Sequence, residues 1–134
     1  MASLIPNDAE VNLIEAIVNK TSNSDLVLRL YTNNYTPLET DTVSNYTEAS
    51  GNGYAAITLT GSSWSIAEGN PATATFAQQT FTFTGALGNV YGYYVTRGDG
   101  ELMWAEKFSS VVDIQNNGDE IKITLQFTLK EPTE

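Results

Sequence analysis

The chain has 134 residues, 41% of them hydrophobic, which is enough for one domain with a buried core. Sixteen acidic and six basic residues give a net charge of −10. This charge excludes nucleic acid and anionic membranes as expected partners, because both need a basic surface. The absence of Cys excludes a disulfide scaffold, and no apolar run approaches the roughly 18 residues of a membrane span.

The N-terminal part of the sequence predicts an arm over residues 1–6 and an amphipathic helix over residues 7–20. The helix begins with Asn-Asp-Ala-Glu, which is a variant of the capping box. Its apolar stripe consists of Val11, Leu13, Ile14, Ile17 and Val18. The helix is expected to close one side of the domain; the alternative is that it docks on a neighbouring chain.

After residue 24 the sequence alternates between short strand patterns and turn signals. The pattern is clearest near the C-terminus, where apolar and polar residues alternate strictly from Ile121 to Leu129. We therefore expect an all-β fold, an antiparallel β-sandwich or Greek-key/jelly-roll-like barrel of seven to eight strands with a short N-terminal α-helix, as a single domain over residues 1–134. The strand patterns cover residues 25–32, 54–60, 72–77, 79–84, both sides of 98–100 and 121–129. Trp64 and Ile66 continue the apolar alternation, and residues 109–115 are a weak strand or an extended link.

Residues 90–108 give the strongest local signal, an aromatic hairpin around Gly98-Asp99-Gly100. A two-residue loop is expected, either Gly98-Asp99 or Asp99-Gly100. In both registers odd positions before the turn share a face with even positions after it. That face is a slab of aromatic surface that needs a second layer, and it contains Tyr91, Tyr93, Val95, Leu102 and Trp104.

A polar stretch at residues 33–53 is long for a loop without structure, and such loops are often functional. We expect it to be an exposed contact loop. On the hairpin, the face opposite the aromatic slab carries Tyr94 and Met103. If exposed, that face would be an apolar patch suited to a partner.

The sequence predicts no catalytic, cofactor or metal site. With neither His nor Cys, Ser-His-Asp and Cys-His arrangements are impossible. The acidic residues, Asp41 among them, gather at turns and termini and are expected to be solvated. Arg97-Gly98-Asp99 spells the integrin-binding tripeptide, but a tight turn needs the same residues. Trp64 and Trp104 are expected in the core by their position in apolar patterns; the alternative is a sugar-binding platform.

Taken together, several segments resemble small proteins encoded among the virion genes of tailed bacteriophages and prophages. The similarity extends over nearly the whole chain. The matching pieces are Leu28-Arg29-Leu30-Tyr31, Thr36-Pro37, Gly53-Tyr54-Ala55, Thr58 to Gly61 with Trp64, Ala77 to Phe83, Val90 to Thr96, Trp104 to Phe108, and Asn116 to Asp119.

The resemblance implies a non-enzymatic virion protein, a capsid decoration (cement) protein on the outer surface of the head. It implies the major capsid protein as partner and a homotrimer as assembly, with contacts through the arm and helix and through the long loop. The expected contact residues are Ile5, Val11, Ile14, Val18, Thr36, Leu38 and Tyr46. The alternatives are a tail or fibre-associated protein that binds the host surface, and a carbohydrate-binding accessory of an enzyme.

Overall fold

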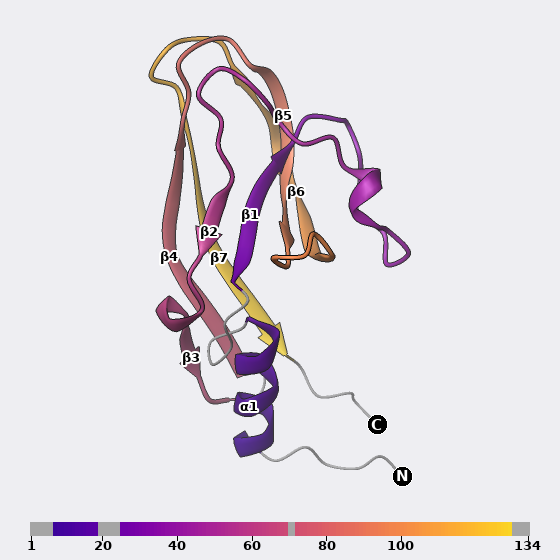
Figure 1. Cartoon of the computed structure of the whole chain (residues 1–134), viewed down its shortest axis with the longest axis vertical. Coiled ribbons are helices and arrows are strands. Elements are labelled where there is room, and N and C mark those ends of the chain that lie inside the picture. The colour runs from indigo at the N-terminus through magenta and orange to yellow at the C-terminus, as the bar shows by residue number, and fades with distance from the viewer. Residues whose placement is uncertain (1–6, 19–24, 70–71, 130–134) are drawn as a thin grey trace. The chain divides into compact units, whose positions relative to one another are not determined.

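The computed structural model describes residues 7–18, 25–69 and 72–129 (Figure 1). Within these ranges the expected all-β class is confirmed: seven strands form a four-stranded and a three-stranded antiparallel sheet in a sandwich-like fold with one short α-helix. The strand order is β2-β1-β5-β6 in the first sheet and β3-β4-β7 in the second. The elements are α1 (Asn7–Ile17), β1 (Leu26–Tyr31), β2 (Ile57–Leu59), β3 (Ser65–Ala67), β4 (Ala72–Thr82), β5 (Gly88–Thr96), β6 (Leu102–Ile114) and β7 (Glu120–Leu129), with 3-10 turns η1 (Val43–Asn45) and η2 (Gly61–Ser63).

The chain divides into two compact units that share two long strands. The first unit contains residues 1–25, 59–78 and 124–134, and the second contains residues 26–58 and 79–123. Both β4 and β7 contribute residues to each unit. The expectation of a single domain over the whole chain stays a prediction.

In the first unit, α1 lies against β3. Ile14 and Val18 are fully buried, as the helical stripe predicts, and Val11 is half-buried. Leu13 is 47% exposed, so the buried stripe is narrower than predicted. The structure places the helix at residues 7–17; the expected arm at residues 1–6 and the last two expected helical residues lie outside the described residues.

The core of the first unit also contains Trp64, which follows η2 and is almost fully buried, as expected. Its ring meets Phe76 of β4 edge-to-face, with the centroids 5.1 Å apart. β3 and β4 pair antiparallel, with Ser65 opposite Thr75. The carboxylate of Asp25 accepts a hydrogen bond from the Gly61 amide at 2.8 Å and so fixes the start of η2.

β4 is one strand, whereas the sequence predicted separate strands at residues 72–77 and 79–84. The buried positions change from even numbers to odd numbers between Phe76 and Phe81, and this change of phase resembles a strand break in the sequence. No Gly or Pro stands between them, so nothing stops the strand. Similarly, β6 continues to Ile114 through the segment that was expected to be a weak separate strand.

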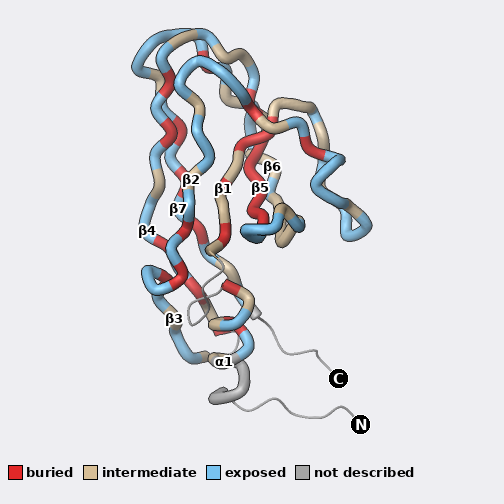
Figure 2. The backbone as a smooth tube through the Cα atoms, viewed as in Figure 1, coloured by how far each residue is buried: buried red, intermediate tan, exposed pale blue. Residues whose placement is uncertain are grey.

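In the second unit, β5 pairs antiparallel with both β1 and β6. Leu26, Leu28 and Leu30 of β1 are fully buried, and the residues between them are half-buried. Figure 2 shows buried positions in turn with half-buried ones along β1, and buried positions between less buried ones along β4. The alternation that predicted these strands is therefore the pattern that builds the core.

β2 is shorter than the expected strand at residues 54–60. The three residues before Tyr54, Gly51 to Gly53, all have positive φ angles of 79°, 49° and 82°, which turn the chain sharply. Tyr54 therefore leaves the strand path. Its ring stacks on Phe81 at 5.7 Å, and its hydroxyl accepts a hydrogen bond from the Leu30 amide at 3.2 Å.

The hairpin between β5 and β6 has a three-residue loop instead of the predicted two-residue loop. The Arg97 amide donates to the Glu101 carbonyl at 2.8 Å, and the Gly100 amide donates to the Arg97 carbonyl at 2.9 Å. Gly100 has a φ of +94°, which glycine adopts without strain. This is the three-residue hairpin in which a left-handed glycine forms a bulge.

Two register shifts between β5 and β6 change which side chains share a face. Val95 pairs with Trp104, but Thr96 pairs with Leu102, so β6 carries one extra residue at that point. Leu102 therefore lies on the face opposite to the predicted one. The other register shift lies between Val90 and Gly92. Tyr91, at this shift, packs together with Leu102 against a cluster of buried tyrosines. The predicted aromatic slab is thus divided between both faces.

Gly92 of β5 should be intolerant of any side chain. A Cβ built at Gly92 would lie 2.6 Å from the Tyr31 hydroxyl and would also collide with the Glu106 carbonyl. We predict that Gly92→Ala lowers the free energy of unfolding by roughly 2–4 kcal/mol in urea denaturation, since the backbone and a packed ring must both move.

The matched control is Gly51→Ala. Gly51 has a positive φ of 79° but nothing within 4 Å of a Cβ, so its substitution strains only the backbone and should cost about 1 kcal/mol. An equal or larger loss for Gly51→Ala would contradict the steric explanation for Gly92.

Candidate functional site

A cluster of tyrosines in the second unit is covered by the loop at residues 33–53. Tyr31, Tyr46 and Tyr94 are buried. Tyr46 stacks on Tyr94 with the ring centroids 5.2 Å apart, and it meets Tyr31 edge-to-face at 5.0 Å. Tyr35 adds a second edge-to-face contact with Tyr46 at 5.5 Å. The loop therefore supplies the layer that buries the Tyr94 face, and that face is not an open patch.

The carboxylate of Asp41 holds this loop together. The Tyr35 hydroxyl donates to Oδ1, while the Leu38 amide and the Tyr46 hydroxyl donate to Oδ2 at 2.8 and 2.7 Å. Burial alone would raise the pKa of Asp41, but the three hydrogen bonds lower it below its ordinary value. Asp41 is thus ionised at neutral pH and is a structural acceptor, contrary to the expectation of a solvated turn acid.

Two further sets of hydrogen bonds fix the ends of the loop. Asn33 donates to the Asn45 carbonyl at 2.9 Å and accepts from the Thr47 amide at 2.8 Å. Asn45 in turn accepts from the Thr42 amide at 2.9 Å, which closes the 3-10 turn η1. The loop expected to be only a contact segment is therefore a built structure with its own side-chain bonds.

An ion pair lies next to the cluster, where the loop returns to β1. Nη1 of Arg29 donates to both carboxylate oxygens of Glu48 at 3.1 and 3.0 Å, and Nε donates to Thr96 at 3.1 Å. The Tyr54 hydroxyl donates to Glu48 at 2.8 Å. The two charged side chains are only 27% and 35% exposed, so this pair is better shielded from water than an ordinary surface pair.

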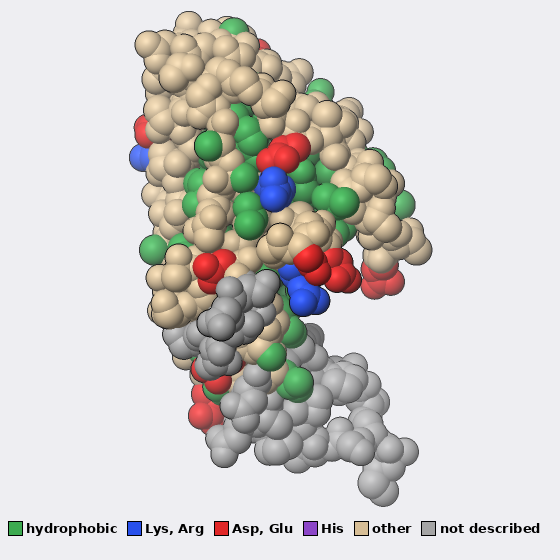
Figure 3. All heavy atoms as spheres, viewed as in Figure 1, with side chains coloured by type: hydrophobic (Ala, Val, Ile, Leu, Met, Phe, Trp, Pro, Cys, Tyr) green, Lys and Arg blue, Asp and Glu red, His purple; other side chains and the backbone are tan. Residues whose placement is uncertain are grey.

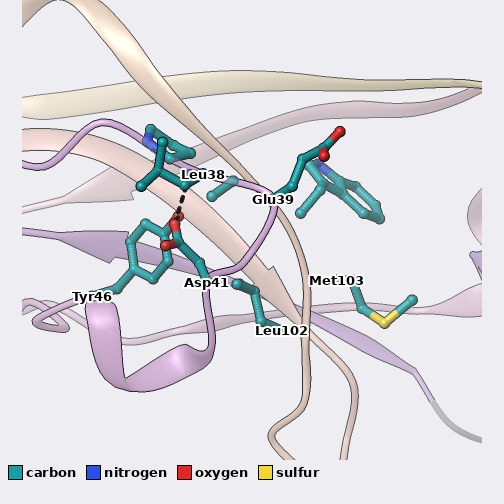
Figure 4. A pocket seen from close by; sticks show the side chains of 9 residues that line it. Leu38, Glu39, Asp41, Tyr46, Leu102 and Met103 are labelled. Carbon is teal, nitrogen blue, oxygen red and sulfur yellow. Dashed lines mark hydrogen bonds between the residues drawn. The ribbon is translucent and has the colours of Figure 1, made fainter.

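A pocket of about 400 Å³ opens between this loop and the beginning of β6. Figure 4 shows Leu38, Glu39 and Asp41 on the loop side of the pocket, and Leu102 and Met103 on the strand side. The full lining is Pro37, Leu38, Glu39, Asp41, Tyr46, Leu102, Met103, Trp104 and Ala105. The walls are mainly apolar or aromatic, and the charged groups among them are carboxylates.

The pocket combines two of the contact residues expected from the sequence with several that the sequence did not indicate. Leu38 and Tyr46 line it, although Tyr46 is buried and Leu38 is 62% exposed. Thr36 is exposed just before it. Met103 was expected on a face suited to a partner if exposed, but not across from this loop. Trp104 was expected in the core, with a sugar-binding platform as the alternative, and it is half-buried in the pocket wall.

The expected contact residues of the N-terminal part lie elsewhere in the chain. Ile14 and Val18 are fully buried within the protein, which accounts for their apolar character without a partner. Val11 is half-buried. Ile5 lies outside the described residues. A contact by Ile14 or Val18 with another molecule would require the helix to move away first.

The tyrosines of the cluster are unsuited to act as nucleophiles or general bases near neutral pH. Burial raises the pKa of Tyr31 and of Tyr94 to about 12, so both phenols stay protonated. Among residues 7–18, 25–69 and 72–129, no group of three or more acidic residues could hold a metal ion. In the same ranges no helix has the length and apolar character to cross a membrane.

Comparison of the chain with protein-family models, with curated proteins and with solved structures finds no match. The pocket and the loop therefore have to be interpreted from their own geometry. That geometry is a fixed loop with apolar side chains at its surface, next to a half-open acidic pocket. It is suited to binding.

Asp41→Asn should loosen the loop. The amide can accept on one side only, so at least one of the three donors loses its acceptor. We predict that hydrogen exchange of the Leu38 amide becomes roughly tenfold faster. Glu39→Gln, which removes the neighbouring charge without removing an observed hydrogen bond, should leave this rate unchanged.

Hydrogen exchange of the Leu38 amide should also show how the stability of the loop depends on pH. Because the pKa of Asp41 is lowered in the folded protein, the protection of Leu38 should be fully present above the ordinary aspartate pKa and lost as the pH falls through the lower folded value. Protection lost at a higher pH, or unaffected by Asp41→Asn, would contradict the role given to this carboxylate.

The Arg29–Glu48 ion pair should contribute more to the free energy of unfolding than the exposed Arg97–Glu101 pair. Glu48→Gln leaves Arg29 without a charged acceptor in a half-buried position, and we predict a loss of about 1–2 kcal/mol in the free energy of unfolding. The control is Glu101→Gln, whose pair with Arg97 is exposed and 3.7 Å long; its loss should stay below about 0.5 kcal/mol. The free energies of unfolding of both variants are measured by urea denaturation. Equal losses would contradict the explanation that the Arg29–Glu48 pair is shielded from water.

Proposed function

We propose that this chain is a non-enzymatic structural protein of a tailed-phage virion, a decoration protein that binds the outside of the head and stabilises adjacent capsid subunits. Its partner is the major capsid protein and its assembly a homotrimer. The proposal joins the resemblance of the sequence to phage virion proteins with the character of the loop at residues 33–53.

The observation that carries the proposal is the exposed side chain of Leu38 on a fixed loop. Leu38 is 62% exposed, yet its amide is bonded to Asp41, and Asp41 is bonded to two tyrosines. An apolar side chain held in this way can be buried by a partner with little further loss of conformational freedom. Val43, at 39% exposure, adds a second apolar side chain on the same loop.

The chemistry of the described residues supports binding over catalysis. The pocket is lined by Asp41, whose two oxygens are both occupied by hydrogen bonds, and by one tyrosine, Tyr46, whose raised pKa keeps it protonated at neutral pH. Acidic side chains also outnumber basic ones on the face shown in Figure 3. An acidic surface of this kind would be steered toward a basic patch on the shell.

The burial of Ile14 and Val18 favours contacts through the loop. Thr36 and Leu38 are exposed there, whereas Tyr46 is buried and shares the Asp41 carboxylate with the Leu38 amide. Ile14 and Val18 act as core residues of the first unit, so the N-terminal contribution to binding would come from residues 1–6, including Ile5.

The test is co-sedimentation with empty capsid shells of the phage that encodes the chain, together with the solution mass by light scattering. We expect a trimer that pellets with shells. Leu38→Ser should weaken shell binding about tenfold or more, because burying one leucine contributes roughly 1.5–3 kcal/mol.

The matched control is Val111→Ser on β6, which also replaces an exposed apolar side chain, 49% accessible, but one that is neither in the loop nor in the lining of the pocket. It should bind shells like the wild type. A chain that ignores shells and pellets with purified tails would contradict the decoration assignment and favour a tail or fibre-associated protein.

A further inference from the structure

The pocket beside Leu38 has two kinds of surface that one ligand would have to satisfy together. Its strand side is formed by Leu102, Met103 and Trp104, a set of apolar, thioether and aromatic groups. Its loop side carries the carboxylates of Glu39 and Asp41. At about 400 Å³ the space is large enough for a long side chain and the backbone that bears it.

The negative charge of the pocket is not neutralised from within the protein. Asp41 is ionised, and no hydrogen bond or ion pair is observed for the exposed Glu39 among the described residues. No basic residue lines the pocket. Three cations of the second unit have partners outside the pocket: Arg29 with Glu48, Arg97 with Glu101, and Lys107 with Asn34.

A side chain with an apolar stem and a cationic end fits both surfaces. The stem of lysine or arginine buries well against apolar walls while its charge stays near water and acidic groups. An aromatic ring such as that of Trp104 adds attraction for the cation. An anionic ligand would be repelled by both carboxylates, and a purely apolar one would gain nothing from Glu39.

We propose that this pocket receives the side chain of a lysine or arginine on the partner protein, with the stem against Met103 and Trp104 and the cation beside Glu39. The inference rests on the proposed function, because it names the group of the capsid surface that this site would hold. Leu38 then packs beside the inserted side chain and excludes water from it.

The test uses small probes and does not need shells. Nα-acetyl-lysine N-methylamide and its arginine analogue are titrated into the full chain, and the indole N–H resonances of Trp104 and Trp64 are followed. The neutral comparison is the norleucine analogue, which keeps the stem and lacks the charge. Trp64 is an internal control, since it is 1% exposed and does not line the pocket.

We expect a saturable shift of Trp104 with lysine or arginine and none at Trp64. Norleucine, and lysine with the Glu39→Gln variant, should bind roughly two- to fivefold more weakly, as one solvent-accessible charge pair allows. Equal binding of norleucine and lysine would overturn the proposal, as would the absence of a saturable shift with either cationic probe at about 100 mM.

Shell binding separates failure of this inference from failure of the proposed function. If the chain pellets with shells and Leu38→Ser weakens that binding, but neither cationic probe shifts Trp104, the decoration function stands and the basic anchor is wrong. If the probes shift Trp104 and the chain ignores shells, the pocket still recognises basic side chains, and the capsid is not the partner.

Discussion

One carboxylate, that of Asp41, determines the shape of the surface on which the proposed functions depend. It joins two tyrosine hydroxyls and a backbone amide, and through them it seats the loop at residues 33–53 on the aromatic face of β1 and β5. Without it, the Tyr46 hydroxyl and the Leu38 amide would lose the acceptor that joins them on the loop side of the pocket. The acceptor works because three donors keep it charged while it is partly shielded from water.

The loop at residues 33–53 supplies both buried side chains for the core and exposed side chains for a proposed partner. The residues that point inward are tyrosines, which bring large apolar area together with a hydroxyl that still needs a partner. Among the mostly polar exposed residues of the loop, Leu38 and Val43 are apolar and have no such requirement. The conformational entropy of the loop is therefore lost during folding, and a partner binds a surface that is already formed.

The sequence predicted the fold class and most strands because alternation with a period of two is a direct consequence of one buried face. The prediction was wrong where the alternation of buried and exposed positions changes from even to odd residues. The extra residue of β6 opposite Thr96 moved Leu102 to the other face, and the change of phase between Phe76 and Phe81 made one strand resemble two. Such shifts depend on how each strand pairs with its neighbour, which the alternation within one strand does not show.

The site was predictable only in part for the same reason. Leu38 and Tyr46 were found as loop residues, and the length of the loop itself indicated a role. The role of Asp41 was missed, since an acid in a polar loop has the composition of a solvated turn. Its one signal was the presence of Tyr35 and Tyr46 close by in the chain. Met103 and Trp104 come from a distant strand, and only the folded sheet places them across from the loop.

The empty position at Gly92 has a consequence for how the strands find each other. Tyr31 lies opposite Gly92, and its ring occupies the space where any other residue would place a side chain. A slip of two residues between β1 and β5 would keep every side chain on its proper face, so alternation alone does not forbid it. It would, however, bring Val90 or Tyr94 opposite Tyr31, and the ring would have nowhere to go. The glycine opposite the tyrosine therefore excludes the two nearest alignments that would preserve the faces of the strands.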